Sequence, residues 1–136
     1  MDSEICKIYK NFKINFSICD LVHIYVLTWN NSFNLEYFIN WYRNRFLNCS
    51  ITVYDNNSTD DTYDISLKYN CQYKLFETND DFNDEIHRNI KNECWKNQKE
   101  KWVFVLDDDE LLDIGPLELI FNPNNIIHFK GVERFN

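Results

Sequence analysis

The stretch WVFVLDDDE, residues 102–110, joins five apolar residues to four consecutive acidic ones. An apolar run of this length, rich in valine and aromatic side chains, is typical of a strand that is covered on both faces of a parallel sheet. Carboxylates placed together at the end of such a strand repel one another unless a cation or water screens them. The stretch therefore predicts a buried strand that ends in a polar site.

Three more apolar runs come before this strand, and segments with helical periodicity separate them. The runs are HIYVL at 23–27, ITVY at 51–54 and YKLF at 73–76, and they contain β-branched and aromatic residues that favour strands. Strands that alternate with helices are typical of βαβ units, which build a mostly parallel central sheet flanked by helices. We therefore predict an α/β fold of the Rossmann-like type.

The segments between the strands predict three helices, each opened by polar residues that can cap backbone N–H groups. The first helix follows the cluster NNS at 30–32 and carries apolar residues at helical spacing as far as Phe46. The second follows STDD at 58–61, which fits a capping box. The third begins at Asp84 as its cap and ends near Lys99.

The two ends of the chain add elements to this core. Residues 1–20 alternate locally between apolar and polar side chains, which predicts an N-terminal extension or edge strand before a main domain at 21–136. After the acidic run, a proline suits the first turn of a short helix at 117–121. A turn at 122–125 and a strand at 126–129 are expected to follow.

Composition limits the partners that the chain can bind. Its 136 residues carry a formal charge of −8, which repels the phosphate backbone of nucleic acid. The same charge disfavours a phosphorylated small molecule unless a cation screens it, so an anionic substrate implies a bound metal. With 44% hydrophobic residues, the chain is apolar enough to fold around a single core.

The sequence contains neither a membrane signal nor a disulfide pattern. Its longest apolar stretch, 21–29, is too short to span a bilayer, and no basic segment leads into an apolar one at the N-terminus. The five cysteines are widely spaced, which indicates reduced thiols. We expect a cytoplasmic protein without a membrane span, and the sequence leaves a homo-oligomer open.

Polar residues follow three of the predicted strands. Thr28, Trp29 and Asn30 follow the first strand, Asp55 follows the second, and the acidic run at 107–110 follows the fourth. Because the carboxyl ends of parallel strands meet along one edge, where such folds bind ligands, these residues are predicted to converge. Carboxylate oxygens suit Mg²⁺ or Mn²⁺, which complete their shells with phosphate oxygens and water.

Each candidate residue also has a purely structural interpretation. The acidic run is a solvated turn if its charges point outward, and Asp55 is an ordinary turn residue. Trp29 suits the core as well as a stacking surface. Arg88 lies on the third predicted helix, and an arginine in such a place is more often a surface residue than a phosphate contact. The three histidines lack metal-ligand spacing and are expected to be structural.

The order and spacing of the motifs resemble those of a known family. HIYVLTWN at 23–30, VYDNNSTDDT at 53–62 and LDDDELL at 106–112 are similar to the donor-binding half of family 2 glycosyltransferases, which have the GT-A fold. The resemblance spans about residues 21 to 114. It implies a truncated GT-A donor-binding domain, because the general base and acceptor-binding residues of the family lie in a second half that this chain largely lacks.

The resemblance also implies roles for the candidate residues. Residues after the first two strands would line a nucleobase pocket, an arginine before the last strand would lie near the nucleotide, and the D-x-D aspartates would contact ribose and metal. The expected substrate-binding residues are Thr28, Trp29, Asn30, Asp55, Arg88, Asp107 and Asp108. Asp109 is the expected metal ligand, Asp107 is the expected ribose or second metal contact, and the expected cofactor is Mn²⁺ or Mg²⁺.

The family transfers a sugar from a nucleotide sugar to an acceptor hydroxyl. The resemblance therefore implies a metal-dependent glycosyltransferase with a nucleotide-diphosphate sugar as donor, a UDP-sugar being favoured, and an unknown acceptor. One alternative is a nucleotide-sugar-binding module without catalysis. Another is a haloacid-dehalogenase-like phosphatase, whose D-x-D also follows an apolar strand but normally opens its domain, whereas 27 residues follow Asp109 here.

Overall fold

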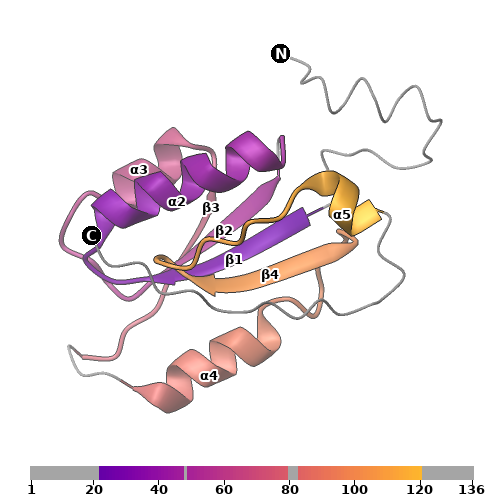
Figure 1. The fold of residues 1–136 in the computed structure, drawn as a ribbon. Helices are drawn as coiled ribbons and strands as arrows, with labels where there is room; N and C mark the ends of the chain where they lie inside the picture. The colour runs from indigo at the N-terminus through magenta and orange to yellow at the C-terminus, as the bar shows by residue number, and fades with distance from the viewer. Residues whose placement is uncertain (1–21, 48, 80–82, 121–136) are drawn as a thin grey trace.

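The computed structural model describes residues 22–47, 49–79 and 83–120, which form a sheet with helices on both faces (Figure 1). The strands of this part of the chain are all parallel and lie in the order β3-β2-β1-β4. The prediction of an α/β fold with a parallel central sheet is confirmed. The strands are β1 (Val22–Thr28), β2 (Ser50–Asp55), β3 (Gln72–Leu75) and β4 (Trp102–Asp107).

Helices alternate with these strands along the chain, as parallel pairing requires. Helices α2 and α3 lie on one side of the sheet, and α4 lies on the other (Figure 1). Because every strand runs in the same direction, all four end at one edge, and the loops that follow them gather there. The helices are α2 (Ser32–Arg45), α3 (Thr62–Lys68), α4 (Asp84–Glu93) and α5 (Pro116–Ile120).

The apolar core lies between the sheet and α2. Ile24 of β1 pairs in register with Ile51 of β2, and Val26 pairs with Val53; all four side chains are buried. Burial of a side chain of this size contributes about 1.5–3 kcal/mol. The core therefore determines where α2 lies relative to the strand ends. The helix contributes the buried residues Leu35, Phe38, Ile39 and Tyr42.

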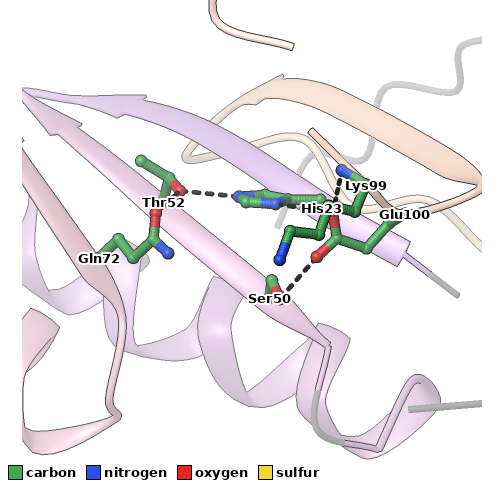
Figure 2. A network of polar contacts seen from close by, with 6 residues as sticks. All are labelled: His23, Ser50, Thr52, Gln72, Lys99 and Glu100. Atoms are coloured by element: carbon green, nitrogen blue, oxygen red, sulfur yellow. Dashed lines mark hydrogen bonds and ion pairs between the residues drawn. The ribbon is translucent and has the colours of Figure 1, made fainter. Parts of the chain in front are cut away.

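The opposite face of the sheet carries a polar network (Figure 2). His23 lies between two partners, with Nε2 2.8 Å from Thr52 Oγ1 and Nδ1 3.3 Å from Glu100 Oε2. Thr52 also contacts Gln72, and Glu100 accepts a hydrogen bond from Ser50 Oγ. The network links three strands to the segment before β4, which gives His23 a structural role. A cleft of about 720 Å³ lies between this face and α4.

The strand predictions agree with the structure to within one residue at each end. The third helix is shorter than predicted: it ends at Glu93, and residues 94–97 form turns. Its cap is Asn83, whose side chain accepts a hydrogen bond from Ile86 N at 3.1 Å, so the prediction of Asp84 as the cap is wrong. The short helix predicted at 117–121 is present as α5.

The caps of α2 and α3 differ from the prediction. The cluster at 30–32 supplies no side-chain cap; Ser32 N donates instead to Asp60 Oδ2 at 3.0 Å. The other oxygen of Asp60 accepts a hydrogen bond from Thr62 N at 3.1 Å, so one carboxylate satisfies the starts of both helices. Burial raises the pKa of Asp60, but the hydrogen bonds from Thr62 and Ser32 outweigh it and lower the pKa overall.

Three cysteines lie in the described residues and are free, as expected of reduced thiols. Burial raises the pKa of Cys49, Cys71 and Cys94 to about 11 in each case, which keeps them protonated. No helix in the described ranges is long and apolar enough to cross a membrane. The elements predicted at 1–20, 122–125 and 126–129 lie outside the described residues.

Candidate functional site

A cleft of about 560 Å³ opens where β1 and β4 end beside α4. It brings together segments that are 80 residues apart in the chain, as the strand-end argument predicts. Six of the predicted site residues line it: Thr28, Trp29, Arg88, Asp107, Asp108 and Asp109. Six residues that the sequence did not single out also line it: Leu27, Asn31, Asp84, His87, Lys91 and Asn92.

Asp108 connects the end of β4 to the end of β1. Its Oδ2 accepts a hydrogen bond from Thr28 Oγ1 at 2.7 Å, and its Oδ1 accepts one from Asn31 Nδ2 at 3.1 Å. Burial raises the pKa of Asp108, the two hydrogen bonds oppose the rise, and the charges of Asp109 and Asp107 add to it. Since both oxygens of Asp108 already have protein partners, this carboxylate holds the two strand ends together.

Asp107 and Glu110 form the turn that carries the acidic run. Glu110 N donates to Asp107 O at 3.1 Å, and Asp107 N donates to Glu110 Oε1 at 2.8 Å. The side chain of Asp107 forms an ion pair with Lys91 of α4, with 2.9 Å between Lys91 Nζ and Asp107 Oδ1. The turn is thus closed by its own backbone, while Asp107 faces the helix across the cleft.

The core of the protein anchors this turn from below. Tyr42 is fully buried in α2, and its hydroxyl donates to Glu110 O at 2.9 Å and accepts from Leu112 N at 2.8 Å. The neighbouring Trp41 donates its ring N–H to Leu112 O at 3.1 Å. Burial raises the pKa of Tyr42 to about 12, so the hydroxyl remains a donor at neutral pH. The acidic run is therefore held on the rigid part of the fold.

Asp109 is the most available carboxylate of the run. It is exposed, and no described residue makes a hydrogen bond or ion pair with its side chain. Asp107 keeps one oxygen, Oδ2, without a described partner. In the described residues, no group of three His, Cys, Asp or Glu side chains is placed to hold a metal alone. The donor set fits Mn²⁺ or Mg²⁺ bound through one or two carboxylates and completed by phosphate oxygens and water.

The loops after β1 and β2 form a second, closed cluster beside the cleft. Asp55 is 1% exposed; its Oδ1 accepts from Ser58 N at 3.1 Å and from Ser58 Oγ at 2.6 Å, and its Oδ2 accepts from Tyr73 at 2.6 Å. Asn30 N donates to Ser58 Oγ at 2.8 Å, and Thr59 N donates to the Asn30 side chain at 2.8 Å. Asn30 and Asp55 are thus next to the cleft but outside its lining.

Trp29 and Arg88 face the solvent side of the cleft. Trp29 is 51% exposed, so it does not fill the core, and its ring is available to a planar ligand. Arg88 is also exposed and belongs to the face of α4 that lines the cleft. The cleft therefore has three carboxylates on the β4 side, and the α4 side carries Arg88 and Lys91 together with Asp84.

Two of the polar residues missed from the sequence contact the acidic run directly. Asn31 was interpreted as a helix cap, although its amide donates to Asp108. Lys91 lies three residues after Arg88, which is helical spacing, so the two lie on the same face of α4. That spacing was a usable signal for Lys91, whereas nothing in the local sequence indicates the partner of Asn31.

No protein-family model and no curated protein matches this sequence. Solved structures do match its fold. The mannosyltransferase PcManGT of Pyrobaculum calidifontis, solved with GDP-Man and Mn²⁺, is 16% identical over 75% of this chain, with a TM-score of 0.53. S. aureus TarS is 23% identical over 72% of this chain, with a TM-score of 0.55. The chain has the GT-A fold.

The match covers only part of each of these proteins. The chain spans 32% of the length of PcManGT and 18% of the length of TarS. At these identities the likeness establishes the GT-A fold and leaves the reaction to be argued from the site.

Proposed function

We propose that this chain is the donor-binding part of a metal-dependent glycosyltransferase. The observation that carries the proposal is the cleft at the ends of β1 and β4 of a GT-A fold, where the acidic run faces Arg88 and Lys91 of α4. A nucleotide-diphosphate sugar needs both kinds of group. Its diphosphate requires cations, and a protein with a net charge of −8 must supply them locally.

Asp109 and Asp107 hold the metal in this proposal, because their carboxylates retain oxygens without described partners. Thr28 and Asn31 keep Asp108 between the strand ends, which sets the position of the two aspartates beside it. Arg88 binds the diphosphate, and Asp107 also contacts the ribose. When bound, Mn²⁺ or Mg²⁺ neutralises the charge that develops on the leaving diphosphate.

The nucleobase binds beside Trp29 in this proposal. Thr28, Trp29, Asn30 and Asp55 are the proposed base pocket, and the exposed indole of Trp29 offers a stacking surface. Asp55 is already hydrogen-bonded by Ser58 and Tyr73. It therefore acts on the base chiefly by holding the loop of Ser58, which in turn binds the backbone of Asn30.

We propose a UDP-sugar as the favoured donor, with the acceptor left unassigned. PcManGT was solved with GDP-Man and Mn²⁺, so a guanine nucleotide is the first competitor to test. A cytoplasmic location is proposed from the composition, and self-association is a property to measure alongside binding.

A thermal-shift panel tests the proposal. UDP-, GDP-, CDP- and TDP-sugars are added to the protein with and without Mn²⁺, and melting is followed for each. A ligand at about 100 times its dissociation constant adds about 2.7 kcal/mol, a shift of several degrees. We expect one nucleotide class to give a melting shift that is larger with Mn²⁺ than without it. No shift with any nucleotide and metal would refute the proposed site, and binding with neither transfer nor hydrolysis would reduce the function to a binding module.

A further inference from the structure

Lys91 forms an ion pair with Asp107, one of the two carboxylates of the proposed metal site. Its ammonium lies 2.9 Å from Asp107 Oδ1, and the two side chains are 36% and 48% exposed. The pair spans the cleft from the last turn of α4 to the last residue of β4. This contact joins the α4 side of the cleft to its β4 side.

A lysine and a divalent cation compete at such a position. At a few ångströms the repulsion between an ammonium and a divalent ion is substantial even in a partly hydrated site. A metal bound to Asp107, even through the other oxygen Oδ2, lies within a few ångströms of this ammonium, so its binding favours moving Lys91 away from the carboxylate. The displaced ammonium then needs another anion, and the diphosphate of a nucleotide placed between the two walls is one.

We propose that Lys91 is a positioning residue that couples metal binding to nucleotide binding at this site. The inference rests on the proposed function. In the ligand-free protein Lys91 neutralises Asp107 and weakens the binding of a divalent cation. When a nucleoside diphosphate binds, Lys91 pairs with it and releases Asp107 to the metal. Because such coupling is reciprocal, the metal also strengthens nucleotide binding.

The proposal predicts effects of opposite sign when Lys91 is neutralised. In Lys91→Gln, Mn²⁺ alone should bind about two- to fivefold more tightly, in proportion to the strength of an exposed ion pair. The same variant should bind UDP or GDP more weakly in EDTA, because the diphosphate loses a cationic partner. A role limited to folding would weaken both interactions, so the signs separate a positioning role from a structural one.

Lys96 provides a matched control. Its ammonium forms an ion pair with Glu93 at 2.8 Å, it is half exposed, and it does not line the cleft. Lys96→Gln makes the same change in net charge and should leave both affinities at the wild-type value. Lys91→Arg retains the charge and should keep Mn²⁺ binding weak.

The measurement is a titration of free Mn²⁺ by electron paramagnetic resonance, with nucleotide binding in EDTA by calorimetry, on the full chain. Tighter Mn²⁺ binding with weaker nucleotide binding in Lys91→Gln alone supports the coupling. Equal Mn²⁺ affinities of Lys91→Gln and the wild type would overturn it, as would weaker or undetectable Mn²⁺ binding in Lys91→Gln. The same gain in Mn²⁺ affinity in Lys96→Gln would also overturn it. If wild-type protein binds no Mn²⁺ even with UDP or GDP present, the proposed function fails as well.

Discussion

The strands β2 and β4 lie on either side of β1, and the aspartates at their carboxyl ends differ in how many hydrogen-bond partners the protein supplies. At the end of β2, Asp55 is 1% exposed and receives hydrogen bonds from Ser58 and Tyr73. After the end of β4, Asp109 is exposed, and no described side chain pairs with it. We call the end of β2 the closed edge, because the protein itself fills the acceptor oxygens of Asp55. We call the end of β4 the open edge, because Asp109 leaves its acceptor oxygens to a ligand.

The difference shows that an aspartate after a parallel strand is not by itself a binding residue. What decides is how many of its acceptor positions the surrounding protein fills, because a filled carboxylate must give up a hydrogen bond before it binds anything else. Asp55 fulfils the structural interpretation of a turn residue. Asp109 retains the capacity that a metal requires.

The largest expected effect comes from removing the closed carboxylate. Asp55→Ala leaves Ser58 N and the Tyr73 hydroxyl without their acceptor in a buried place. We expect the free energy of unfolding to fall by about 2–4 kcal/mol, measured by denaturant titration.

Asp109→Ala is the matched variant, since it removes the same side chain from the open edge. Its free energy of unfolding should stay within about 0.5 kcal/mol of the wild type. An equal loss in the free energy of unfolding for Asp55→Ala and Asp109→Ala would contradict the distinction between a closed and an open edge.

A smaller effect is expected where the core supports the open edge. Tyr42→Phe removes the hydroxyl that bonds Glu110 O and Leu112 N, and we expect a loss of about 1–2 kcal/mol of stability. Because the same hydroxyl anchors the acidic turn, Mn²⁺-dependent nucleotide binding should also weaken. Tyr37→Phe, on the exposed side of the same helix, should change neither property.

Undiminished binding by a destabilised Tyr42→Phe protein would show that the acidic turn does not depend on this anchor.

The smallest effect concerns the polar network on the other face. Burial lowers the pKa of His23 below its ordinary 6.5, although Glu100 opposes the shift. The unfolded chain therefore binds the proton more readily, and the stability due to neutral His23 is lost as the pH falls below about 6.5 towards the folded pKa. Urea unfolding from about pH 7 to about pH 5 should show this slope, and His23→Gln should reduce it. Parallel profiles of the two proteins would argue against the burial of a neutral imidazole.

The strands were predictable because their signal is local. Each strand is a run of apolar or β-branched residues, and each helix that covers the sheet shows its own helical periodicity. Neither signal depends on residues elsewhere in the chain. The helix caps were less predictable, because Ser32 N finds its acceptor in Asp60, 28 residues away. Local capping rules consider only the residues next to the helix, so they chose the wrong oxygen.

The candidate site was predictable to the extent that parallel strands end at one edge. This rule placed Thr28 and the acidic run in one cleft. It does not reveal which carboxylates the protein fills, since Asp55 also receives a hydrogen bond from Tyr73 of β3, and Asp108 receives one from Asn31. Nor does it show that Lys91 faces Asp107, which depends on the rotation of α4 about its own axis.

The most direct test of the account compares Asp109→Asn with the wild type in Mn²⁺-dependent binding of the nucleotide sugar selected by the panel. Asparagine has nearly the shape of aspartate but lacks the charge that a divalent cation requires. Isothermal titration calorimetry should show that Asp109→Asn weakens binding in Mn²⁺ by about tenfold or more, since even the loss of a residue that only supports a metal ligand typically costs about 10- to 100-fold. In EDTA the two proteins should bind equally, and unchanged Mn²⁺-dependent affinity in Asp109→Asn would contradict the metal assignment on which the account depends.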